Sequence, residues 1–266
     1  MVPERYDQGP RETDGDEVYR EEADITPDLF YDKLAHSRVL PTTSAPSVGD
    51  FLAVYEPLLN EGHDILSIHI SSKLSATYSN ACQTAERLRQ RGHIEVVDSL
   101  NASFALGLLV LAAARAARSG ASLEEAKAVA LSGVLRVRMV FVVDTLEYLR
   151  RGGRIGRARA LLGTVLRVKP ILSVREGEVH PEGRVRTMAH ALDRIYQFCL
   201  SYPGAREMAV GYSTNPQEAE ELRQRLAAAY PKANIVMTRV GPVLGAHTGP
   251  GVMGVGLIEE EEQGLA

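Results

Sequence analysis

Short runs typical of strands alternate with longer helical runs between residues 64 and 133, and this alternation constrains the fold more than any other feature. Strands are expected over 64–70 and 94–98, and helices over about 76–91, 104–119 and 122–133. Strands connected through helices of this length lie parallel, because a parallel pair needs a long crossover connection. We therefore predict an α/β fold whose first part is a three-layer domain built on a parallel sheet.

The pattern changes after about residue 134. From there on, the sequence shows signals of a β-hairpin in addition to those of helices. Two short β-type runs flank Glu176-Gly177, a pair suited to a tight hairpin turn. Further strands are expected over 140–143, 208–212, 235–239 and 252–258, and helices over 145–150, 187–200 and 217–230. This mixture predicts a second α/β domain with a mixed sheet. We expect domains over 1–133 and 134–266, with a ligand crevice between them.

The start of the chain carries weaker signals. The first two dozen residues are polar and show no period, so they are expected to be mostly irregular. A short helix is expected over 25–34, and a hydroxyl-rich loop over 41–47 precedes a helix that ends near residue 60. No apolar core of a secretory signal is present, so the cytoplasm is the expected location.

Composition excludes several classes of protein. Hydrophobic residues make up 45% of the 266, but no run approaches the length of a membrane span. The net charge is −4, the 30 Lys and Arg are spread along the chain, and there are five Phe and no Trp, so nucleic acid is not expected as a partner. Cys82 and Cys199 are expected to be buried free thiols, and the seven His show no metal-binding spacing.

Hydroxyl side chains are concentrated in the loops that follow the early strands. They are Thr42, Thr43 and Ser44, then Ser71, Ser72, Ser75 and Thr77, then Ser99 and Ser103. Ligands of open α/β sheets bind outside the carboxyl ends of the strands, and hydroxyl groups can donate hydrogen bonds to an anion there. The alternative is that these hydroxyls only cap helices and satisfy the backbone of the loops.

A histidine stands out in the segment 245–251. His247 is flanked by Gly and Pro just before an apolar β-type run, so we expect it in a loop, where it can donate to an anion. The alternative is a histidine that only caps the turn. Residues 249–254 match G-x-G-x-x-G by letter, but Pro250 and the strand that follows do not fit a dinucleotide site, and no nucleotide-cleaving motif is present.

Six motifs in order resemble the DegV family. They are the segments 42–47, 70–78, 97–99, 141–155, 168–172 and 245–251, within a resemblance that covers about residues 24 to 258. The resemblance implies two α/β domains that enclose a long-chain fatty acid and present its carboxylate to a separate fatty acid kinase, which makes the acyl phosphate. It implies a lipid-binding carrier subunit rather than an enzyme, with the fatty acid as ligand and no cofactor.

The resemblance also implies roles for individual residues. Thr43, Ser75 and His247 would bind the carboxylate, Ser44, Ser72 and Thr248 would extend the head-group loops, and Arg154 would lie near the kinase-docking surface. Two departures are visible. Family members open with a strand that ends in Thr-Asp-Ser, which this sequence lacks, so the first strand is expected to be missing. Ala45 occupies a position where Gln is common in the family.

Two other functions remain open from the sequence. The first is an esterase or acyl-transfer enzyme with Ser75 as nucleophile and His247 as base. Against it, neither an acid that would orient His247 nor a nucleophile elbow is evident. The second is a sensor that reports lipid supply to another protein.

Overall fold

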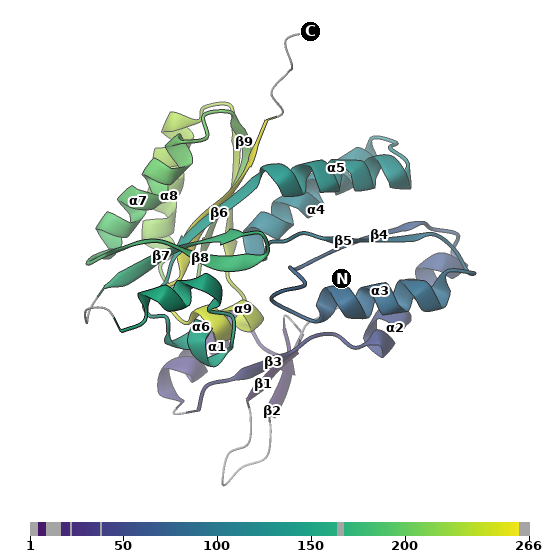
Figure 1. Ribbon diagram of the computed structural model, residues 1–266, viewed down its shortest axis with the longest axis horizontal. Coiled ribbons are helices and arrows are strands. Elements are labelled where there is room, and N and C mark those ends of the chain that lie inside the picture. The colour runs from purple at the N-terminus through teal and green to yellow at the C-terminus, as the bar shows by residue number, and fades with distance from the viewer. Residues whose placement is uncertain (1–4, 9–16, 22, 38, 164–167, 261–266) are drawn as a thin grey trace.

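A six-stranded mixed sheet organises the second half of the chain in the computed structural model, which describes residues 5–8, 17–21, 23–37, 39–163 and 168–260 (Figure 1). Its strands are β6 (Val137–Val142), β7 (Lys169–Arg175), β8 (Glu178–Val185), β9 (Ala205–Tyr212), β10 (Asn234–Arg239) and β11 (Met253–Glu259). Their order is β10-β9-β11-β6-β7-β8, and only β9 and β10 are parallel neighbours. The predicted mixed sheet is confirmed, as is the hairpin at Glu176-Gly177, where both residues have positive φ.

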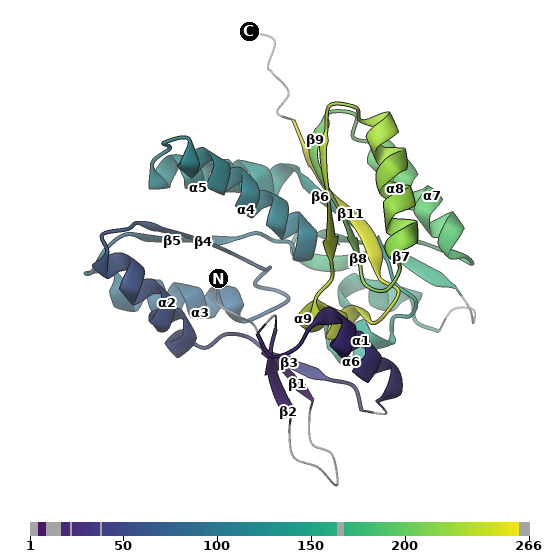
Figure 2. The same ribbon diagram turned by 180° about the vertical axis from the view of Figure 1, so that it is seen from behind.

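The alternation of side chains along β6 shows how this sheet is covered. Val140 and Val142 pack in the core under α7 (Met188–Leu200) and α8 (Pro216–Ala229). Met139 and Phe141 point to the opposite face, into the core that contains Phe104 of α4 (Ser103–Arg118). Figures 1 and 2 show α7 and α8 on one side of the sheet and α4 on the other. Both faces of the sheet are therefore buried.

A second sheet consists of the parallel strands β4 (Ile65–His69) and β5 (Ile94–Asp98), and it has only these two strands in the part of the chain that the structure describes. The helices α2 (Val48–Asn60) and α3 (Thr77–Leu88) lie on one side of it, and α4 and α5 (Leu123–Arg136) lie on the other (Figure 2). The predicted parallel three-layer arrangement is thus present. Capping boxes open two of these helices, Ser47 with Asp50 and Ser122 with Glu125.

One helix serves both sheets. α4 contacts β4 of the parallel pair and also packs on β6, β9 and β11 of the mixed sheet. The expected boundary between the two parts, at residues 133 and 134, falls inside α5, whose last turn ends at Arg136 just before β6. No helix in the described ranges is long and apolar enough to cross a bilayer.

The expectation of a mostly irregular start was wrong for two segments. β1 (Arg5–Gln8) and β2 (Glu17–Arg20) form a small antiparallel sheet with β3 (Thr42–Ser44), which lies within the segment predicted as a hydroxyl-rich loop. Each strand has at most four residues, and β3 pairs with β1 far along the chain, so local patterning could not show them.

The helix that follows was predicted correctly and connects the two ends of the sequence. α1 (Pro27–His36) buries Phe30, Tyr31 and Leu34 against α9 (Pro242–Thr248). The Tyr31 hydroxyl donates to the backbone carbonyl of Val240 at 3.1 Å. The amino-terminal segment therefore fixes the position of α9, which carries His247.

Candidate fatty-acid site

A mostly apolar cavity of about 180 Å³ lies between the α4 face of the mixed sheet and the loops of the first half. Its apolar lining includes Phe104, Met139, Phe141, Val174 and Val179. Its polar lining consists of Thr43, Ser44, Ser75, Ser103, Arg154, His247 and Thr248. Segments from both halves of the sequence thus meet around one cavity.

Three separate elements bring the predicted head-group residues to this cavity. Thr43 is the central residue of β3, Ser75 lies in the turn between β4 and α3, and His247 is in the last turn of α9. The expectation that His247 lies in a loop was wrong. Pro242 starts the helix and Gly249, with φ of 74°, ends it, so the same Gly and Pro that indicate a loop enclose one short helix.

Thr43 and His247 are joined directly. Thr43 Oγ1 lies 2.8 Å from His247 Nε2, although the residues are 204 positions apart. His247 Nδ1 is buried and has no hydrogen-bond partner among the residues that the structure describes. Burial, and secondarily the positive charge of Arg154, lowers the pKa of His247 to about 4. The imidazole is therefore neutral at pH 7, with Nε2 on the side of the Thr43 contact and Nδ1 facing Gly152.

A close backbone approach fixes the imidazole. A Cβ at Gly152 would lie 2.2 Å from His247 Nδ1, so no side chain fits at this position without displacing the ring. Gly152 follows the short helix α6 (Glu147–Arg151), which packs against α9. The turn that follows α6 is thus one wall of the histidine site.

The hydroxyls around Ser75 have a local role as well. Ser75 Oγ lies 2.8 Å from Thr77 Oγ1 and accepts the Thr77 amide at 3.3 Å, in a turn that leads into α3. This contact matches the structural alternative, but Ser75 also lines the cavity. Of the additional residues, Ser44 and Thr248 line the cavity too, and Thr248 Oγ1 donates to the Leu244 carbonyl. Ser72 is exposed outside the lining, with its amide facing the Asp98 carboxylate at 3.3 Å.

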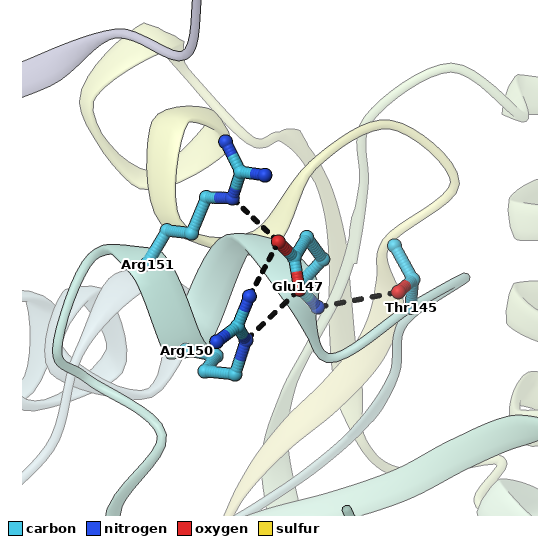
Figure 3. Close-up of polar contacts among 4 residues, drawn as sticks. All are labelled: Thr145, Glu147, Arg150 and Arg151. Atoms are coloured by element: carbon cyan, nitrogen blue, oxygen red, sulfur yellow. Dashed lines mark hydrogen bonds and ion pairs between the residues drawn. The ribbon is translucent and has the colours of Figure 1, made fainter.

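Arg154 differs from most cations of its segment, which face carboxylates. Figure 3 shows Arg150 and Arg151 both bound to the Glu147 carboxylate, whose pKa they hold at about 2. Arg157 and Lys169 also face carboxylates, those of Glu178 and Asp144.

The half-buried Arg154 instead donates to two backbone carbonyls. Its Nε donates to Leu74 at 2.9 Å and a terminal nitrogen donates to Gly152 at 2.6 Å. Within the described segments it has no carboxylate partner. The structure thus places Arg154 on the cavity lining. The position near a kinase-docking surface, which the resemblance implies for this residue, stays a prediction.

These groups suit the binding of an anion attached to an apolar chain. A cationic guanidinium and hydroxyl groups can contact a carboxylate at one end, while the apolar lining receives the chain. The arrangement suits nucleophilic catalysis less well. No hydrogen bond joins Ser75 to His247 in the described part of the chain, and a pKa of about 4 makes His247 a weak base at pH 7.

Sequence reasoning missed the apolar side of the cavity. Phe104 lies in the first turn of α4 and Met139 lies in β6, and neither belongs to a motif with polar chemistry. The only sequence signal was the apolar character of these elements, which does not distinguish a cavity wall from a filled core.

Known proteins resemble this chain over nearly its whole length. The family model described as "Uncharacterised protein, DegV family" matches residues 13–260. A DegV domain-containing protein of Clostridium acetobutylicum is 34% identical over 252 residues, which cover 92% of this chain and 87% of that protein.

Two solved structures extend the resemblance to three dimensions. A DegV family protein from Thermus thermophilus, described as binding fatty acid, has a TM-score of 0.88 and 35% identity, with 97% of this chain and 91% of that chain covered. DegV of Bacillus subtilis, described as a fatty acid binding protein, has a TM-score of 0.84 and 31% identity, with 98% and 91% covered.

Proposed function

Because this chain belongs to the DegV family, we propose that it binds a long-chain fatty acid and presents the carboxylate to a separate fatty acid kinase, which forms the acyl phosphate. The observation that carries the proposal is a single cavity with an apolar lining and a polar group made of Thr43, His247 and Arg154. The fatty acid binding described for the Thermus thermophilus and Bacillus subtilis proteins supports it.

The proposal assigns the carboxylate to Thr43, Ser75 and His247. Ser75 supplies one hydroxyl donor. The hydrogen bond between Thr43 and the neutral His247 uses one of the two protons of this pair, so the pair supplies one further donor to the carboxylate. Burial of each methylene contributes about 0.8 kcal/mol, so a dozen methylenes contribute on the order of 10 kcal/mol before the costs of ordering. The polar groups then need only fix the position of the carboxylate.

Arg154 is proposed to face the kinase. Its guanidinium has no carboxylate partner within the described ranges, and, unlike Arg159, which also contacts only a backbone carbonyl, it lines the cavity beside the group that would hold the acyl carboxylate. A cation at this position favours an incoming anionic phosphoryl group as well as the carboxylate itself. The kinase would then carry out the chemistry, and the two halves of this chain would serve as the walls of the binding crevice.

The proposal is tested by identifying the bound molecule. Protein purified under native conditions is denatured and extracted, and the extract is analysed by mass spectrometry; we expect a long-chain fatty acid in about one equivalent. Incubation with a fluorophosphonate probe serves as a control for the esterase alternative, because a carrier is not labelled. Protein that contains no fatty acid and binds none when it is added would refute the proposal.

The kinase step is tested separately. Affinity capture with the native protein as bait should recover a nucleotide-binding protein, and that protein with ATP should phosphorylate the bound fatty acid. Fatty acid binding without any kinase-dependent phosphorylation would retain the carrier function and refute the kinase partnership.

A further inference from the structure

The strand register of the mixed sheet gives the depth of the cavity. β6 leads into α6 through residues 143–146, and α9 leads into β11 through residues 249–252. Because β6 and β11 are antiparallel neighbours, both connections leave the same end of the sheet. The elements that carry Arg154 and His247 are therefore attached at the carboxyl end of β6, and residues nearer the start of β6 lie deeper.

Met139 occupies the deepest row of the lining. It pairs with Gly256 on β11, and on β7 the register places it next to Val174, which in turn pairs with Val179 on β8. Met139, Val174 and Val179 all line the cavity. Val137, the next residue on this face, is buried and is not part of the lining, so the cavity ends at the Met139 row. At the other end of the lining is Val252, which precedes Met253, the partner of Val142. Val252 therefore lies level with Val143, four positions along the strand from Met139, a distance of roughly 13 Å.

The same row is closed on the helix side by Phe104. A Cβ at Gly211 would lie 2.2 Å from a ring carbon of Phe104, and one at Gly256 would lie 3.1 Å from another. The ring therefore rests directly on the backbone of β9 and β11, and the glycine on β11 belongs to the Met139 row. Phe104 cannot move toward the sheet, so its ring forms a fixed wall at the deep end of the cavity.

The geometry points to Met139, backed by Phe104, as the residue that sets the longest acyl chain the cavity accepts. This inference rests on the proposed function and adds its length specificity. A methyl-terminated chain whose carboxylate is held near His247 runs along β6 and meets the Met139 side chain at the end. Met is unbranched and flexible, so its side chain determines how far the terminal methylenes can extend.

The test compares the chain-length preference of variants. Lipid-stripped wild type, Met139→Ala and Met139→Phe are titrated with saturated straight-chain acids from lauric to arachidic acid. We expect the optimum to move to longer acids in Met139→Ala and to shorter acids in Met139→Phe. Each additional methylene that a variant buries should tighten binding about fourfold.

Val140→Ala is the matched control. Val140 is adjacent in β6 and also buried, but it points to the opposite core, so its truncation should leave the length preference unchanged. Should Met139→Ala not fold, Met139→Val and Met139→Phe give the same comparison. If wild type binds the acids and the Met139 variants keep its length optimum, the inference is overturned and the proposed function stands. If wild type binds no acid of the series, the proposed function fails and the inference with it.

Discussion

Stability should fall with the pH between about 6.5 and about 4, and His247 should account for a definite share of that loss. The pKa of His247 is about 4 in the folded chain, against an ordinary value of 6.5 in an unfolded one. Between these two values the unfolded state binds a proton that the folded state does not bind. The free energy of unfolding therefore increases with pH in this interval and is lost as the pH falls.

The size of the effect follows from the two pKa values. A difference of about 2.5 pKa units corresponds to about 3 kcal/mol below pH 4, of which about 2 kcal/mol is lost between pH 7.5 and pH 5. His69, whose pKa burial also lowers to about 4, should contribute a similar amount. Glu147 and Glu220 have pKa values of about 2 against an ordinary value of 4.5. Their contribution to the free energy of unfolding is therefore lost only as the pH falls below about 4.5, which lies below the interval from pH 7.5 to pH 5.

The assay is urea unfolding of lipid-stripped protein at a series of pH values from 7.5 to 5. Replacement of one histidine by Gln removes one titrating group, so His247→Gln and His69→Gln should each reduce the pH dependence by about half. The two variants control for each other, because their histidines lie in different cores. An unchanged slope in His247→Gln would mean that His247 binds protons equally in the folded and unfolded states, and the lowering of its pKa by burial would be refuted.

Three further predictions concern the polar end of the cavity. Ser75→Ala and His247→Ala should each weaken fatty acid binding by roughly 10- to 150-fold, since each loses a hydrogen bond to a charged group worth about 1.5–3 kcal/mol; calorimetric titration measures this, and wild-type affinity in both variants would show that the carboxylate binds elsewhere. Arg154→Ala should slow kinase-dependent phosphorylation at saturating fatty acid, while Arg157→Ala, which removes a cation facing Glu178, should not; equal rates for wild type and Arg154→Ala would leave Arg154 only its contacts to the Leu74 and Gly152 carbonyls. Gly152→Ala should weaken fatty acid binding, because the new Cβ displaces the His247 ring, whereas Gly153→Ala places its Cβ in open space and tests backbone strain alone; equal affinities for the two variants would refute the steric argument.

The sequence predicted those elements whose signals are local. The strand over 94–98 coincides with β5, and the hairpin at Glu176-Gly177 is present, because alternation and turn chemistry depend on neighbouring residues. The helix α9 was missed because its seven residues are enclosed by Gly and Pro, which indicate a loop when only the sequence is considered.

The candidate site was only partly accessible from the sequence. The hydroxyl loops and His247 could be selected by chemistry, and Thr43 and His247 are indeed within hydrogen-bond distance. The positions of Arg154 and Met139 on the lining depend on strand register and on the approach of α9, which no local pattern encodes. The contacts between residues far apart in the sequence are therefore the part of the site that only the three-dimensional structure reveals.

The separation of 204 residues between Thr43 and His247 has a consequence for synthesis on the ribosome. At about 5–20 residues per second, His247 is added roughly 10 to 40 s after Thr43. During that interval α1 and β3 have no α9 to pack against, so the apolar residues of α1 face the medium or a chaperone. The cavity can close only when the last helix has been made, and a nascent chain therefore cannot hold an acyl ligand in this site.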